Sequence, residues 1–290
     1  MTSRPAFVFL AALSLAPHSS KASELEPTLT RLARVAELYR DTALGFACQE
    51  TIVYTGPASG RIQFAYIFIK DEHGRLRDFR TWKTGTTGKQ RGQEVDPADY
   101  RVPRFLASAY LWAFVFRSDR QPLYSFRRLG EETVGNRTSV TIEFQPRGSV
   151  RKGLNDWAGY ADIDSDTSQI LRVEAYTPAD WDRKGRRDAD VLAAPYWDPR
   201  QIHPAYDVER IVTEFGFVKN GMRFPSHVEI TTTRSTFMAG ATHDVLREST
   251  IRKVTQEYSR FEFFSVRTSA EIMRFVSGEG PLLAAPSPAP

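Results

Sequence analysis

The amino-acid sequence predicts a mainly β, α+β fold, in which one large curled antiparallel sheet wraps around a buried apolar helix and an amphipathic helix precedes it. Three observations predict this class. Nine or ten segments rich in aromatic and β-branched residues follow one another with short turns. A sheet of that width tends to curl. Residues 105–116, FLASAYLWAFVF, are apolar on nearly every side, and such a helix must be covered by other parts of the chain.

The N-terminus has the pattern of a secretory signal peptide. Arg4 supplies a basic start, an apolar run extends from Ala6 to Ala16, and small residues precede the expected cleavage site. The apolar run is much shorter than the roughly 20 residues that a membrane-spanning helix needs. We therefore expect cleavage near Ala22, with residues 1–22 as the signal peptide. The mature protein is expected to be periplasmic or secreted and not integral to the membrane.

The mature chain has enough apolar material for one domain. Of 290 residues, 41% are hydrophobic and 12% aromatic, so we expect a single β-rich domain over residues 23–265. Cys48 is the only cysteine, which excludes an internal disulfide. Two of the 39 basic residues, Arg4 and Lys21, leave with the signal peptide, so 37 stand against 35 acidic ones, a balance that gives no argument for nucleic-acid binding. Residues 266–290 predict a C-terminal extension with a disordered tail rich in proline and alanine.

An amphipathic helix is expected between Pro27 and Thr42. Apolar residues recur there at steps of three and four: Leu29, Leu32, Ala36 and Tyr39. The first three strands are expected at 46–54, 61–70 and 76–82. Because side chains alternate along a strand, the second of these places its apolar residues on one face: Ile62, Phe64, Tyr66 and Phe68.

The strands resume after the apolar helix. They are expected at 122–134, 138–146, 157–164, 169–176, 207–218, 223–234 and 245–258. The turn Lys219-Asn220-Gly221 joins two of them as a hairpin. Residues 178–205 carry several prolines and are expected to form an exposed loop excursion.

Three alternating aspartates, Asp162, Asp164 and Asp166, raise the question of a calcium loop. A helix–loop–helix calcium site needs glycine at its sixth position and glutamate at its twelfth, where this chain has Thr167 and Val173. Strand alternation favours a different interpretation, in which Asp162 and Asp164 face water. The residues DSDTS then form a turn through side-chain hydrogen bonds to nearby backbone N–H groups. We predict a turn here and no metal site.

No catalytic or cofactor-binding motif is recognisable. The histidines, whose spacing is not that of zinc ligands, are His18, His73, His203, His227 and His243. Cys48, in GFACQET, is expected to be a buried and inert strand cysteine, with a cysteine nucleophile as the alternative. Serine-hydrolase, P-loop and Rossmann signatures do not occur in the sequence. We expect no enzyme activity and no cofactor.

A basic run lies within the expected loop excursion. Its members are Arg183, Lys184, Arg186 and Arg187, interrupted by Asp182 and Asp188. Such a run most often forms a solvated loop, and contact with anionic lipid headgroups is the alternative.

Two segments resemble a known family. They are DWAGYADIDSDTSQILRVE and VTEFGFVKNGMRFPSHVEI, with Trp157, Gly159, Asp164, Thr167, Ile170 and Arg172 in order, followed by the hairpin with Gly221, Phe224 and Pro225. This order resembles the periplasmic lipoprotein-carrier superfamily of LolA, LolB and LppX-like proteins, loosely from Leu29 to Tyr258. The chain is also similar to uncharacterised exported bacterial proteins. The resemblance implies a half-open antiparallel β-barrel, plugged by helices, whose apolar interior holds acyl chains. We identify no arginine that matches the one these carriers use inside the barrel.

The leading hypothesis is an exported, non-enzymatic carrier or binding protein. Its ligand is expected to be apolar, such as a lipid or a lipoprotein acyl chain, held in the concave face of the curled sheet. The residues predicted to line that face are Phe64, Tyr66, Phe68, Val140, Ile142 and Phe144 from strands and Trp112 and Phe116 from the apolar helix.

Two alternatives stay open. The same residues are also the pattern of an ordinary packed core. The protein would then be a structural or protein-interaction module of the cell envelope, acting through residues 178–205 or a sheet edge, with an envelope protein as its partner. An envelope hydrolase using Cys48 or a histidine is the third hypothesis.

Overall fold

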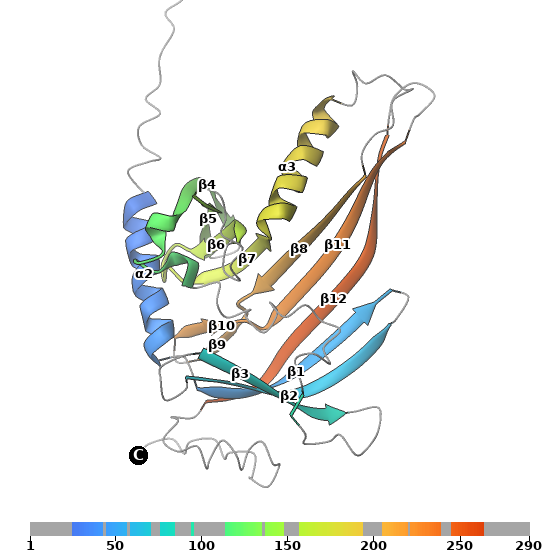
Figure 1. The fold of residues 1–290 in the computed structure, drawn as a ribbon. Coiled ribbons are helices and arrows are strands. Elements are labelled where there is room, and N and C mark those ends of the chain that lie inside the picture. Colours follow the sequence, from blue (N-terminus) through green and yellow to red (C-terminus); the bar gives the residue numbers. More distant parts are fainter. Residues whose placement is uncertain are drawn as a thin grey trace, which may run out of the picture.

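In a computed structural model, the described part of the chain forms a ten-stranded antiparallel sheet, a small two-stranded sheet and two α-helices (Figure 1). The described residues are 25–42, 45–56, 59–70, 76–84, 94–95, 114–134, 137–147, 157–193, 205–219, 221–238 and 245–263. The mainly β architecture predicted from the sequence is confirmed. The signal peptide, most of the apolar helix with Trp112, and the C-terminal tail lie outside the described residues and stay predictions.

The strand order across the sheet is β3-β2-β1-β12-β11-β8-β7-β6-β5-β4. The strands are β1 (Phe46–Thr55), β2 (Gly60–Lys70), β3 (Leu76–Thr84), β4 (Tyr124–Val134), β5 (Arg137–Pro146), β6 (Ala158–Asp164), β7 (Ile170–Tyr176), β8 (Tyr206–Glu214), β11 (His227–Met238) and β12 (Val245–Phe263). The last strand, β12, inserts between β1 and β11, so the first and last parts of the described chain pair side by side. β3 and β4 are the two edges.

A small second sheet interrupts the expected strand pattern. Residues 207–218 divide into β8 and β9 (Phe217–Lys219), and residues 223–234 divide into β10 (Met222–Phe224) and β11. The break falls at Gly216, whose backbone N–H donates to Ser226 Oγ at 3.0 Å and where an added Cβ would lie 2.6 Å from that oxygen. The predicted hairpin turn is present between β9 and β10, where Gly221 adopts a φ of 76° that glycine tolerates.

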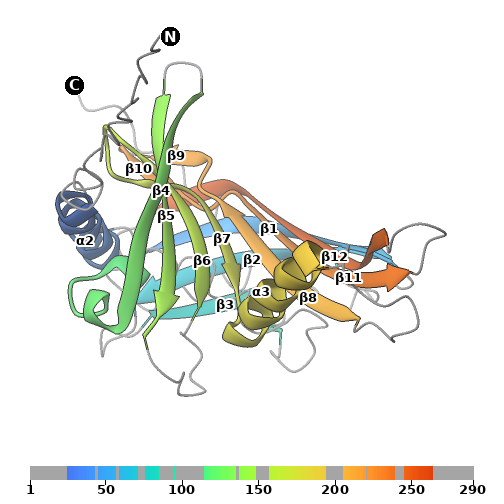
Figure 2. The same ribbon diagram turned by 90° about the horizontal axis from the view of Figure 1, so that it is seen from above.

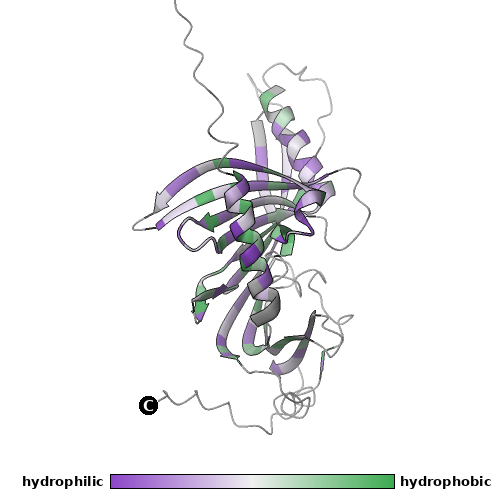
Figure 3. Cartoon of the chain, turned by 90° about the vertical axis from the view of Figure 1, so that its left-hand side faces the viewer, coloured by the Kyte–Doolittle hydropathy of each residue, from purple (hydrophilic) through white to green (hydrophobic). Residues whose placement is uncertain are grey.

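Helix α2 (Leu25–Thr42) confirms the expected opening helix. It packs its apolar side on one face of the sheet, which we call the inner face, and Leu32, Ala36 and Tyr39 are buried there. Figure 2 shows α2 beside the β4 end of the sheet, and Figure 3 shows hydrophobic and hydrophilic residues alternating on it. The short 3₁₀ helix η4 (Gln121–Leu123) joins this layer, because Gln121 Nε2 donates to the carbonyl oxygen of Leu29 at 2.8 Å.

Helix α3 (Pro178–Ala193) corrects the expectation of an exposed loop over residues 178–205. The helix begins after Thr177, whose Oγ1 accepts a hydrogen bond from the backbone N–H of Asp180 at 3.1 Å. Trp181 packs against Tyr160 and Tyr176 on the outer face, with ring centroids 5.3 and 5.5 Å apart. The sequence Thr-Pro-Ala-Asp is a helix-start signal. The prolines further along and the basic run are typical of a loop, and they favoured the wrong prediction. Residues 194–204 lie outside the described part.

None of the helices in the described ranges has both the length and the apolar composition needed to cross a membrane.

Candidate functional site

The inner face of the sheet carries one large apolar cluster. It extends from α2 across the strands, and it includes every predicted lining residue that the structure describes: Phe64, Tyr66, Phe68, Phe116, Val140, Ile142 and Phe144. Each of these is at most 7% exposed. The structure therefore brings the predicted residues together: those of β2 and β5 occupy alternate positions on strands that share this face, and Phe116 reaches it from a helical turn. Their role in binding stays a prediction, and Trp112 lies outside the described residues.

Phenylalanine side chains concentrate at one end of this face. Phe217 stacks on Phe261 with ring centroids 4.3 Å apart and an interplanar angle of 12°. Phe263 and Phe224 continue the group at 4.8 Å from each other, and Phe46 contacts Phe261 at 5.5 Å. Phe217, Phe261 and Phe263 are only partly buried. This end of the inner face is therefore both aromatic and partly accessible.

A polar cluster is buried in the middle of the apolar face. Glu50 is 0% exposed and Arg80 is 7% exposed. Arg80 Nη2 donates to Glu50 Oε1 at 2.9 Å, and Arg80 Nε donates to the other carboxylate oxygen. Arg80 Nη1 donates to Asp78 Oδ2 at 3.0 Å, and Gln256 Nε2 donates to Glu50 Oε1 at 3.0 Å. Two carboxylates and one guanidinium thus share a site surrounded by apolar side chains.

Aromatic and sulfur groups surround the ion pair. The Arg80 guanidinium carbon lies 4.5 Å from the centroid of the Tyr66 ring, a cation–π distance. Burial raises the pKa of the Asp78 carboxyl, and the attraction to Arg80 only partly opposes this effect. Burial, and secondarily the charge of Glu50, raises the pKa of the Cys48 thiol. Cys48 therefore stays a protonated thiol at neutral pH, as expected of an inert strand cysteine, which argues against a thiolate nucleophile.

No motif or spacing in the sequence marks Glu50, Asp78, Arg80 or Gln256 as site residues. A signal was available, because Glu50 lies two residues from Ile52, and Arg80 two residues from Trp82, so each charge shares a strand side with an apolar residue. The signal was ambiguous for Arg80, since Phe79 on the opposite side is equally apolar. Only the pairing of Arg80 opposite Tyr66 decides which side faces inward.

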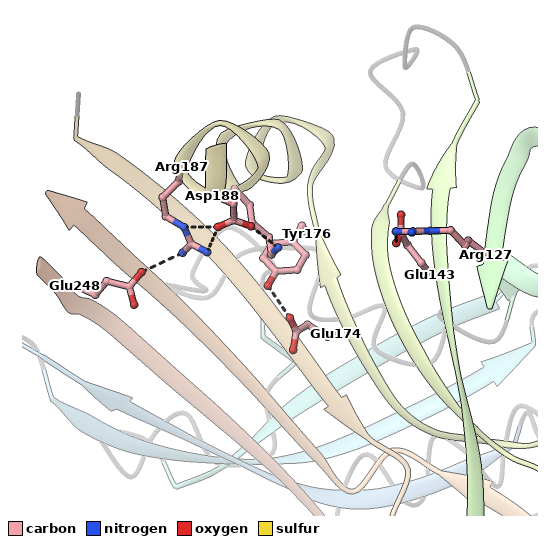
Figure 4. Close-up of polar contacts among 8 residues, drawn as sticks. Arg127, Glu143, Glu174, Tyr176, Arg187, Asp188 and Glu248 are labelled. Atoms are coloured by element: carbon pink, nitrogen blue, oxygen red, sulfur yellow. Dashed lines mark hydrogen bonds and ion pairs between the residues drawn. The ribbon is translucent and has the colours of Figure 1, made fainter. Parts of the chain in front are cut away.

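A polar groove lies on the opposite, outer face, between α3 and the sheet, with a volume of about 520 Å³. Figure 4 shows Arg187 of α3 reaching Glu248 of β12, with Nη1 3.2 Å from Oε1, and also contacting Asp188. Tyr176 donates to Glu174 at 2.7 Å. Burial alone would raise the pKa of Glu174, but the hydrogen bonds from Tyr176 and Arg172 outweigh it and lower that pKa. The charges of this groove are paired with one another.

The aspartate-rich segment forms the predicted turn. Asp164 Oδ1 accepts hydrogen bonds from the backbone N–H groups of Asp166 at 3.1 Å and Thr167 at 2.9 Å. The expectation that Asp164 faces water is wrong, because it is 6% exposed and its Oδ2 lies 3.8 Å from Arg223 Nη2. Asp162 instead accepts from Thr141 at 2.8 Å. Within the described residues, no group of three or more histidine, cysteine, aspartate or glutamate side chains converges to hold a metal.

The fold is similar to three solved structures. They are a LolA superfamily protein from Nitrosomonas europaea (10% identity, 84% of this chain, 98% of that one, TM-score 0.43), a DUF1329 family protein from Desulfovibrio piger (12%, 86%, 96%, 0.47) and an outer-membrane lipoprotein-sorting protein domain from Vibrio parahaemolyticus (13%, 87%, 98%, 0.46). These are structural similarities to a LolA superfamily protein and to lipoprotein-sorting and DUF1329 domains, distant in sequence, and they assign no ligand. No protein-family model and no curated protein sequence matches the chain.

Proposed function

We propose that the chain is an exported, non-enzymatic carrier or binding protein that holds an apolar ligand, such as an acyl chain, against the inner face of its sheet. In this proposal the sheet curls into a half-open barrel, and the inner face is its concave side. The signal-peptide pattern at residues 1–22 supports export to the periplasm. Burial of apolar groups supplies the affinity, at about 0.8 kcal/mol for each methylene removed from water.

The observation that carries the proposal is the Glu50–Arg80 pair inside the apolar cluster. Well-packed apolar side chains usually stabilise a core as well as a buried ion pair does, or better, so such a pair is weak evidence for a stability role. Burial raises the pKa of the neighbouring Cys48 thiol well above its ordinary value, and buried groups with strongly shifted pKa values concentrate at functional sites. Gln256 adds a further indication, because its Oε1 is buried and no described residue donates a hydrogen bond to it. This acceptor is available to a hydroxyl or amide group of a ligand.

A second candidate function has its own observation. The lining residues on the inner face are almost fully buried, with Tyr66 and Ile142 at 0% and Phe64 at 1% exposure. A fully packed core of that kind favours a structural or protein-interaction module, which would act through its surface. The two candidates differ in one respect, because a carrier must open its inner face to a ligand and a packed module need not.

The test is a titration of the mature protein with a fluorescent fatty-acyl probe. The proposal predicts saturable binding at about one probe per chain, which an unlabelled fatty acid displaces. It also predicts that Ile142→Asp, which introduces a charge into the apolar face, abolishes binding, provided that circular dichroism shows the variant folded. Arg127→Ala on the outer face is the control, since Arg127 is 70% exposed. A folded wild-type protein without saturable binding would favour the packed module.

A further inference from the structure

Strands β8, β11 and β12 extend beyond the strands that flank them, β7 and β1. β7 pairs with β8 only over Ile211–Glu214, and β1 pairs with β12 only from Lys253 onward. The remaining lengths of β8, β11 and β12 pair with one another as a three-stranded ribbon. Helix α3 lies alongside β8 where β7 no longer does, as Figure 1 shows. This ribbon continues the inner face past the apolar cluster.

The chemistry of the inner face changes along the ribbon. Ile230 pairs with Ile211 and with Val254, and all three are at most 2% exposed. Two residues further, Thr232 pairs with Glu209 and with Arg252, and after two more, Arg234 pairs with Asp207. Side chains two residues apart share a face, so the apolar surface passes directly into a charged one. The distance from Ile230 to Arg234 is about 13 Å along the strand.

A cleft opens beside this charged end. It has a volume of about 660 Å³ and lies between α3 and the ribbon, lined by Arg183, Arg186, Ala205, Tyr206, Asp207, Arg234 and Thr236. Three guanidinium groups therefore face one carboxylate. Arg234 holds Asp207 through two hydrogen bonds of 2.7 and 2.6 Å, and Arg183 contacts Asp180 at 2.8 Å. Arg186 is exposed and makes no ion pair with any residue that the structure describes.

We propose that this cleft binds a phosphate-type oxyanion, the headgroup of an amphipathic ligand whose apolar chain lies on the inner face. The inference rests on the proposed function and specifies its ligand class as an anionic lipid. Guanidinium groups recognise phosphate through paired N–H donors, and Arg186 supplies donors that no described carboxylate occupies. Asp207 and Arg234 share the inner face of the ribbon with the apolar cluster, whereas Arg183 and Arg186 reach the cleft from α3 at the β8 edge. In the proposal, one ligand extends from the inner face to this edge.

The experiment compares two ligands with the same chain and different headgroups. Dodecyl phosphate and neutral dodecyl maltoside are titrated below their micelle concentrations, with inorganic phosphate as a third arm. The proposal predicts that dodecyl phosphate binds about tenfold more tightly than the maltoside, as expected for charge-assisted hydrogen bonds at a partly exposed site. Added salt should reduce this preference, because screening weakens exposed charge interactions.

Substitutions in the cleft test whether it is the source of the preference for dodecyl phosphate. Arg186→Glu, and the milder Arg186→Gln, should remove it while leaving maltoside binding unchanged. Arg137→Glu is the matched control, because Arg137 is an exposed arginine on β5, outside the cleft lining. Equal binding of both ligands, or a preference that survives Arg186→Glu, would overturn the headgroup site and leave the carrier proposal standing. Binding of inorganic phosphate as tight as that of dodecyl phosphate would assign the cleft to free phosphate. Binding of neither amphiphile would contradict the carrier proposal itself.

Discussion

At the scale of single residues, the buried pair of Glu50 and Arg80 allows the stability of the inner face to be tested separately from ligand binding. Removing one partner of a buried pair leaves the other charge uncompensated, which typically costs about 3–5 kcal/mol, whereas replacing both with apolar groups of similar size is often neutral. These residues therefore allow stability to be separated from binding. If the pair serves the ligand, its removal should affect binding even when stability is preserved.

The single variant Arg80→Met is expected to lower the free energy of unfolding by about 3–5 kcal/mol, because Glu50 stays buried without its partner. The double variant Glu50→Leu/Arg80→Met should recover most of that loss. Urea denaturation measures both. The carrier account further predicts weaker acyl-probe binding by the double variant, and unchanged binding would show that the pair has no part in ligand recognition.

Asp164, at the end of β6, makes a pH-dependent contribution to the free energy of unfolding. Burial acts to raise the pKa of its carboxyl, but the backbone N–H groups of Thr167 and Asp166, together with Arg223, outweigh it and lower that pKa. A folded pKa below the unfolded value of about 3.9 means that the carboxylate stabilises the fold above that pH. The contribution is lost as the pH falls through the folded pKa.

Asp164→Asn should therefore reduce the free energy of unfolding by roughly 1 kcal/mol at pH 7, since the amide oxygen keeps the turn hydrogen bonds but loses the charge. Thermal unfolding of both proteins from pH 7 to pH 3 measures the difference, which should shrink toward the acid end. A difference that is constant with pH would contradict the assigned role. Asp166→Asn is the control, because Asp166 is exposed on the same turn.

At the scale of elements, α3 has a start signal that can be tested. Thr177→Ala removes the side-chain acceptor for the N–H of Asp180 and should cost about 1 kcal/mol. Gly185→Ala should have the opposite sign, with a gain of roughly 0.5–1 kcal/mol, because Gly185 is helical and exposed and an added Cβ meets nothing within 4 Å. Urea denaturation checks both. If neither substitution changed the free energy of unfolding, residues 178–193 would not be helical in solution.

Most strands and α2 could be predicted because their periodicities are local. Alternating aromatic and β-branched residues identify strands, and they also identified the inner-face side chains of β2 and β5. Helix α3 could not be identified as readily, because its residues are polar on most sides and few apolar positions mark a face. The Glu50–Arg80 pair depends on β1, β2 and β3 lying side by side, which no single strand encodes.

At the scale of the whole molecule, two surfaces of the inner face adjoin a cleft between α3 and the β8 edge. The order along the molecule runs from apolar to charged. A partly accessible group of phenylalanines lies at one end, and the apolar cluster with its buried ion pair lies in the middle. The arginine-lined cleft lies beyond the other end. An amphipathic ligand matches that order, and a purely structural module has no need of it. The central claim is therefore that the protein is isolated with a lipid on this face.

Mass spectrometry of an organic-solvent extract tests that claim most directly. The mature protein, purified from the cell envelope without detergent, should release a lipid in near-stoichiometric amount, and the ligand-class inference adds that this lipid carries an anionic headgroup. Protein with Ile142→Asp, purified in parallel and shown to be folded, should release much less. An extract of the wild-type protein that contains no lipid above the level of this variant would contradict the account and support the packed module.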